Sequence, residues 1–256
     1  VKYFLPPKVS GYYVAASMVA RVPFFLFWGI SATILPAVSQ ALGAGTMGKV
    51  RSAIQQAFRF LFLLTIPIGV LVSIYSRNIM VLLFPLDYAA GGKILAVLIW
   101  GMTFLSFVSL LTTIINADNR PQLSFKITVL TVILDVILNR FFVPHFGAIG
   151  GAISTTVAVG AGAVIAMIFV YRRFRVFVKP KSLLRVSGTV ITVGLISILF
   201  KVDGHYFLIP FSLSFVLYGL GLFVIGEVKI KEIFGLFKNK SSEEVITPAQ
   251  GDSLPL

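Results

Sequence analysis

The segment 11–40 holds thirty residues and a single charged side chain, Arg21. As one helix it would be roughly 45 Å long, which exceeds the roughly 30 Å hydrocarbon layer of a bilayer. Pro23 and Pro36 each remove a backbone donor and crowd the preceding turn, so such a helix is expected to bend near both ends. The segment therefore predicts a bent, over-long membrane-spanning helix.

The same apolar character recurs along the chain. Of its residues 57% are hydrophobic and only 12% are charged, against about 25% charged in ordinary soluble domains. Because a soluble fold of this size cannot bury so much apolar surface, we expect an all-α, polytopic membrane bundle of about seven transmembrane helices. Within a membrane domain at 11–226, the expected spans are 11–41, 53–75, 93–116, 122–142, 148–171, 183–200 and 206–226.

The flanking segments have a different composition. Residues 1–10 are interpreted as the end of a truncated preceding helix and an outer loop. Residues 227–240 place Ile230, Ile233, Phe234 and Phe237 on one helical face, which predicts an amphipathic helix on the membrane surface. Residues 241–256 are polar and contain two prolines, and are expected to form a disordered cytoplasmic tail.

The basic residues indicate the orientation. The net charge is +13, but Lys and Arg lie between apolar runs, so we expect no nucleic-acid partner. Thirteen of them fall on the side that includes the C-terminus and six on the other. The excess predicts a multi-pass protein of the cytoplasmic (plasma) membrane with its C-terminus in the cytoplasm. The absence of cysteine excludes disulfides and thiolate metal sites within the chain.

Three motifs occur in the order expected of one family. They are GYYVAA with the ARVP and LPAVS that follow it, INADNRP at 115–121, and PHFGAIGGAIST at 144–155. In this order the motifs resemble the C-terminal half of polysaccharide and oligosaccharide flippases of the multidrug/oligosaccharidyl-lipid/polysaccharide (MOP) exporter superfamily, which is MATE-like. The resemblance covers roughly residues 1–175.

The resemblance implies a two-lobed helical transporter with a basic central cavity. It further implies a missing N-terminal lobe as partner, a lipid-linked glycan as substrate, and alternating access as mechanism. Two alternatives stay open: a cation-coupled multidrug exporter of the same superfamily, and a membrane-embedded glycan-assembly enzyme or subunit.

Charged and polar residues within spans are the candidate substrate-cavity residues. Arg21 either faces a water-filled cavity and attracts a diphosphate head group, or extends to the outer interface, since residues 22–42 suffice to span. The fourth span carries a polar stripe, spaced by three or four residues: Ser124, Thr128, Thr131, Asp135 and Asn139. The stripe either lines the route, with Asp135 coupling to H⁺ or Na⁺ or pairing with a cation, or bonds its own helix near the outer boundary.

Other residues predict mechanical roles. Pro23, Pro36 and Pro67 are hinge candidates for alternating access, or else static kinks. A small-residue face at Ala148, Ala152, Thr156 and Gly160 predicts close helix packing. No nucleophile-elbow, Walker or dinucleotide-binding motif occurs, and His145 and His205 lack further ligands at metal spacing. We therefore expect neither catalytic residues, nor a metal site, nor a cofactor.

Overall fold

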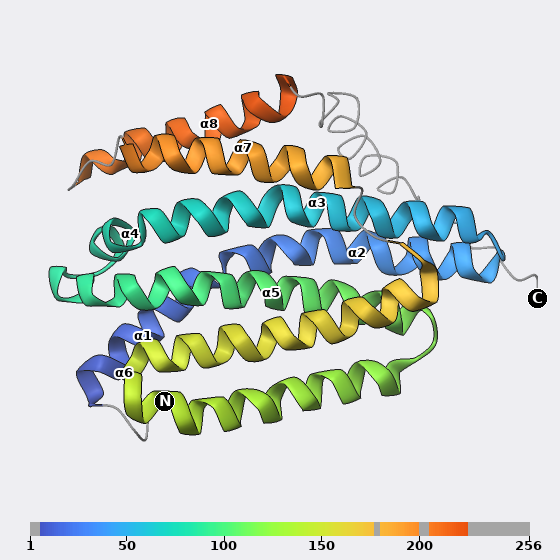
Figure 1. Ribbon diagram of the computed structural model, residues 1–256, viewed down its shortest axis with the longest axis horizontal. Coiled ribbons are helices and arrows are strands. Elements are labelled where there is room, and N and C mark those ends of the chain that lie inside the picture. The colour runs from blue at the N-terminus through green and yellow to red at the C-terminus, as the bar shows by residue number, and fades with distance from the viewer. Residues whose placement is uncertain (1–5, 177–179, 200–204, 225–256) are drawn as a thin grey trace, which may run out of the picture.

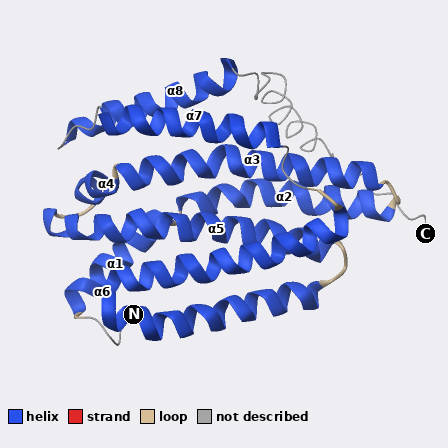
Figure 2. Cartoon of the chain, in the orientation of Figure 1, coloured by secondary structure: helices blue, strands red, loops and turns tan. Residues whose placement is uncertain are grey.

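Helices account for the regular structure of the chain. The computed structural model describes residues 6–176, 180–199 and 205–224, and within these ranges there is no strand. The helices lie side by side as long rods joined by short turns (Figures 1 and 2). The prediction of an all-α membrane bundle is confirmed.

The first expected span is two helices. Helix α1 covers Pro7–Ala20 and helix α2 covers Val22–Gly43, with Arg21 between them. The expectation of one helix that bends near Pro23 was therefore wrong in detail. Pro23 lies in the first turn of α2, where its missing N–H would have no partner within the helix, so this proline starts a helix instead of bending one.

A longer helix and an unexpected short one follow. Helix α3 spans Met47–Ile74, and helix α5 spans Gly91–Ala117. Between them, in the interval between the expected spans 53–75 and 93–116, lie helix α4, Ser76–Leu83, and the 3₁₀ helix η1, Leu86–Ala90. Helix α4 buries Met80 in the same apolar cluster as Ile94 and Leu95 of α5.

Helix α6, Pro121–Phe174, is a hairpin. Its 54 residues would extend about 81 Å if straight. Gly147 breaks it with φ 59° and ψ −140°, backbone values that favour glycine. Its first arm, Pro121 to Phe146, and second arm, Ala148 to Phe174, therefore run antiparallel (Figure 1). Gly150 packs against the carbonyl of Phe142, so the turn has no room for a side chain there.

The last two long helices lie beside α3. Helix α7 covers Pro180–Leu199, and helix α8, Leu208–Val224, follows the short 3₁₀ helix η2, His205–Phe207. Val190 of α7 and Leu222 of α8 share an apolar cluster with Leu71 of α3. The expected surface helix at 227–240 and the expected tail at 241–256 lie outside the described residues.

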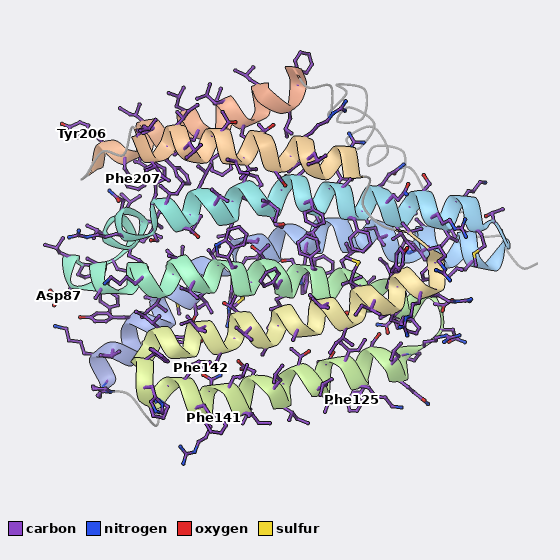
Figure 3. All side chains as sticks on the ribbon, viewed as in Figure 1. Asp87, Phe125, Phe141, Phe142, Tyr206 and Phe207 are labelled. Carbon is purple, nitrogen blue, oxygen red and sulfur yellow. The ribbon has the colours of Figure 1, made fainter. Side chains whose placement is uncertain are left out.

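The outer surface of the first arm of α6 is apolar. Phe125, Val132, Val136 and Phe141 are all more than half exposed. Figure 3 labels Phe125 and Phe141 on this arm. Among the described residues, three helical segments are long and apolar enough to cross a membrane: Met47–Ile74, Leu86–Ala117 and Pro121–Phe174. Exposed apolar side chains on helices of this length are typical of a surface that contacts lipid.

Each end of the bundle holds ion pairs. At the end that we name the Asp118 end, the Asp118 side chain is only 4% exposed and accepts two bonds from Arg173, at 2.9 Å and 3.0 Å. Arg120 adds a second ion pair at 3.3 Å. At the opposite, Asp87 end, Lys8 lies 3.3 Å from Asp87, and both side chains are well exposed.

Candidate functional site

The polar stripe on the first arm of α6 divides into packed and exposed members. Ser124 is buried, and its hydroxyl donates to the Thr112 carbonyl of α5 at 3.2 Å. Thr131 donates to the Ile127 carbonyl of its own helix and packs against Gly162 of the second arm. Thr128 is exposed and donates to the Ser124 carbonyl at 2.9 Å. Ser124 and Thr131 therefore contact neighbouring helical segments, and Thr128 bonds its own helix.

Asp135 and Asn139 belong to a cluster built by three helical segments. The Asn139 amide donates to the Asp135 carboxylate at 3.0 Å and to its backbone carbonyl at 2.8 Å. Thr155, on the second arm, lies close enough to the Asp135 carboxyl and to the Tyr13 hydroxyl of α1 to influence both groups. We name Tyr13, Asp135, Asn139 and Thr155 the polar cluster.

Asp135 lies near the middle of the first arm of α6. It is 14 residues from Pro121 and 12 residues from Gly147, or roughly 21 Å and 18 Å along the helix. Its position relative to the outer membrane boundary stays a prediction. A partly buried carboxylate inside a membrane helix needs hydrogen-bond donors, and Asn139 supplies one.

Arg21 is placed away from the polar cluster. It is exposed at the junction of α1 and α2, and its carbonyl accepts bonds from the Phe24 and Phe25 amides. Along α1 it is eight residues beyond Tyr13, or roughly 12 Å. Among the described residues, the Asp135 carboxylate accepts a hydrogen bond from Asn139, and Arg21 is not one of the groups that influence it.

The other hinge candidates lie inside helices. Pro36 is exposed in α2, and Pro67 is buried in α3. Because Pro67 has no N–H, the Leu63 carbonyl one turn earlier loses its helical donor. The Tyr218 hydroxyl of α8 donates to that carbonyl at 2.9 Å. The turn of α3 that contains Pro67 is thus tied to α8, and the hinge role of the three prolines stays a prediction.

The small-residue face packs as predicted. Ala148 and Ala152 are buried in the cluster that contains Leu95 and Leu98 of α5. Thr156 also contacts α5, through its hydroxyl and the Val97 carbonyl at 3.2 Å. The prediction of close helix packing is confirmed.

Two parts of the site were not predicted. Tyr13 and Thr155 were not among the candidate residues predicted from the sequence, although they lie within the motifs GYYVAA and PHFGAIGGAIST. The sequence signal for Thr155 was its place in PHFGAIGGAIST, and Tyr13 had only its polar hydroxyl within an apolar run. Within the described residues, no group of three His, Asp or Glu side chains that would suit a metal ion occurs.

The chain was compared with known proteins. Against "Probable low-salt glycan biosynthesis flippase Agl15" of Haloferax volcanii it is 26% identical over 162 residues, covering 63% of this chain and 34% of that protein. Against "Probable multidrug resistance protein NorM" of Bradyrhizobium diazoefficiens it is 29% identical over 168 residues, covering 60% and 35%. The chain thus spans about a third of the length of these relatives.

A solved structure has the same fold. The inward closed conformation of the lipid II flippase MurJ superposes with a TM-score of 0.73 at 20% sequence identity, over 83% of this chain and 46% of that one. At this identity the likeness establishes the fold. The sequence model of the family described as lipid II flippase MurJ matches residues 3–221, which is most of the chain. The protein therefore belongs to the MurJ family of the MOP exporter superfamily.

Proposed function

We propose that this chain forms a lobe of a flippase that moves a lipid-linked oligosaccharide or polysaccharide precursor across the cytoplasmic membrane. The observation that carries the proposal is the match to the flippase family over residues 3–221. The polar cluster supports it physically, because polar groups halfway through a membrane helix mark transport routes and coupling sites. Alternating access would move this lobe against a second lobe, the partner that the resemblance implies.

Two features suit a carrier of amphiphilic anions. The Arg21 guanidinium is exposed beside an open apolar surface that includes Met18 and Phe25. Guanidinium groups bind diphosphate oxygens in a fork geometry. Arg21 is therefore our candidate for head-group attraction, while Asp135 in the polar cluster is our candidate for coupling to H⁺ or Na⁺.

The test is a leaflet assay with the full-length protein. The protein is reconstituted into liposomes whose inner leaflet alone carries a fluorescent polyprenyl-diphosphate sugar, and exposure of the label at the outer surface is followed by quenching. We expect exposure faster than in protein-free liposomes and in liposomes with an unrelated membrane protein. Equal rates in all three would contradict the proposal.

A multidrug exporter is the second candidate, favoured by the similarity to NorM. Such a carrier needs acidic and aromatic groups for organic cations, and the exposed Arg21 repels them. Deletion of the gene distinguishes the two functions. Increased drug sensitivity with unchanged surface glycan would indicate the exporter, and loss of surface glycan with unchanged drug sensitivity would indicate the flippase. Sugar transfer by the purified protein would instead indicate a glycan-assembly enzyme.

A further inference from the structure

The last two turns of α6 have one packed face. Val170 is fully buried and Phe174 is 1% exposed in the apolar core. Arg173 holds Asp118 on this side, and the Phe174 carbonyl accepts a bond from the Arg51 side chain of α3 at 3.0 Å. This face is fixed to its neighbours, so the C-terminal end of α6 has a defined position in the Asp118 end of the bundle.

The other face of the same turns is open. Ile168, Tyr171 and Arg172 share one face, because the last two follow the first by three and four residues. Arg175 follows directly after the helix, as its C-cap residue in the left-handed conformation. These four residues and Met167 line a groove of about 810 Å³. Ile168 and Tyr171 are 48% and 44% exposed. In the described part of the chain, neither Arg172 nor Arg175 forms an ion pair.

The groove continues as an apolar strip along the helix. Val164 and Ile165 lie one turn before Ile168 on the same side and are 59% and 41% exposed. From the middle of the helix toward its end, the order is thus aliphatic side chains, a tyrosine and then two guanidinium groups. This order matches a phospholipid, whose acyl chains, interfacial region and phosphate follow in the same sequence.

We propose that this groove, defined by Met167, Ile168, Tyr171, Arg172 and Arg175, binds an anionic phospholipid of the cytoplasmic leaflet. The proposal rests on the orientation that the distribution of Lys and Arg predicts, in which the Asp118 end, with Arg120 and Arg173, faces the cytoplasm. Arg172 and Arg175 together carry more positive charge than one phosphate neutralises. They therefore favour a head group with a net negative charge over a zwitterionic head group, which brings a cation of its own. The groove lies within the roughly 300–1,000 Å³ range of small-ligand sites.

The groove is separate from the polar cluster. Tyr171 is 16 residues beyond Thr155 on the same arm, or roughly 24 Å along the helix. A lipid bound at this groove would hold the end of α6 at the membrane surface while the polar cluster moves substrate. Lipid binding is therefore measurable without transport, and its outcome does not depend on the proposed flippase activity.

The experiment measures lipid binding to the full-length protein by native mass spectrometry in mild detergent. Phosphatidylglycerol and phosphatidylcholine are titrated separately against wild type, R172Q/R175Q and a matched control, K49Q/K126Q. The control removes two exposed lysines from the same end of the bundle, outside the groove. Thermal unfolding without added lipid confirms that each variant is folded, and the single variants R172Q and R175Q replace the pair if it is not.

We expect wild type to prefer phosphatidylglycerol, and R172Q/R175Q to weaken that binding by roughly thirtyfold, since each of the two cations near the surface contributes on the order of 1 kcal/mol. Binding of phosphatidylcholine should not change, and K49Q/K126Q should stay within about twofold of wild type, because its charges lie outside the groove. Equal losses in both double variants, or none in either, would overturn the proposal. Displacement of phosphatidylglycerol by a polyprenyl-diphosphate sugar would assign the groove to the transported substrate and overturn it too.

Discussion

Asp118 shows how one residue can hold one end of a membrane bundle together. Its nearly buried carboxylate joins the turn after α5 to the end of α6 through Arg173. The hydrogen bond and the charge of Asp118 raise the pKa of Arg173 above its ordinary value. A raised pKa in the folded state means that the stabilising contribution is present below the ordinary pKa of arginine and is lost only in strong alkali.

We expect Asp118→Asn to lower the free energy of unfolding by about 1–2 kcal/mol, because the amide keeps the shape but loses the charge-assisted bonds. Thermal unfolding in detergent measures the change, which should be the same at neutral and mildly alkaline pH. Asp87→Asn is the matched control, since its side chain is 73% exposed and exposed pairs contribute little. Similar losses in both variants would contradict the assignment.

Asp135 is the residue on which the coupling proposal depends. Asp135→Asn keeps a side chain that can bond Asn139 and Thr155 but removes the charge. If Asp135 couples to H⁺ or Na⁺, the initial transport rate under an ion gradient should fall roughly tenfold, within the usual range for coupled sites. Thr192→Val in α7 is the control, because Thr192 lies outside the stripe, is exposed and bonds its own helix. An unchanged rate and ion dependence in Asp135→Asn would remove Asp135 from the mechanism.

At the scale of helices, a tyrosine on α8 compensates for a proline in α3. The Tyr218 hydroxyl bonds the Leu63 carbonyl that Pro67 leaves without a helical donor. We expect Tyr218→Phe to destabilise the protein by roughly 1–3 kcal/mol, the cost of an unsatisfied buried carbonyl. In a Pro67→Ala background the alanine N–H can supply the missing bond, so the same substitution should cost less. A double-mutant cycle by thermal unfolding measures the difference, and strictly additive effects would exclude the compensation.

At the scale of the whole molecule, the unequal distribution of Lys and Arg predicts the orientation in the membrane. The 256 residues contain no cysteine, so an introduced thiol is unique within this chain. A thiol in Leu86→Cys, at the Asp87 end, should react with a membrane-impermeant maleimide on intact cells. A thiol in Gln122→Cys, at the Asp118 end, should react only after the membrane is opened. The reverse labelling pattern would indicate the opposite orientation in the membrane, and it would exclude the proposed lipid groove from the cytoplasmic leaflet.

The sequence by itself determined the class of fold and the position of the polar stripe. The thickness of the bilayer sets a minimum length of apolar helix whatever its neighbours are, so hydropathy alone located α3, α5 and the arms of α6. Helical spacing alone placed Ser124, Thr128, Thr131, Asp135 and Asn139 on one face. Both signals are local, because they depend only on residues within one helix.

Only the tertiary structure decided which residues meet across helices. Arg173 bonds Asp118, 55 positions earlier, and Tyr218 reaches a carbonyl 155 positions earlier. The break at Arg21 was likewise beyond the sequence, which offered two prolines in the segment and no sign that one would begin a new helix. The reason is physical: a polar group inside a membrane protein must find a partner, and its chemistry specifies the kind of partner, whereas only the packing of helices determines which residue it is.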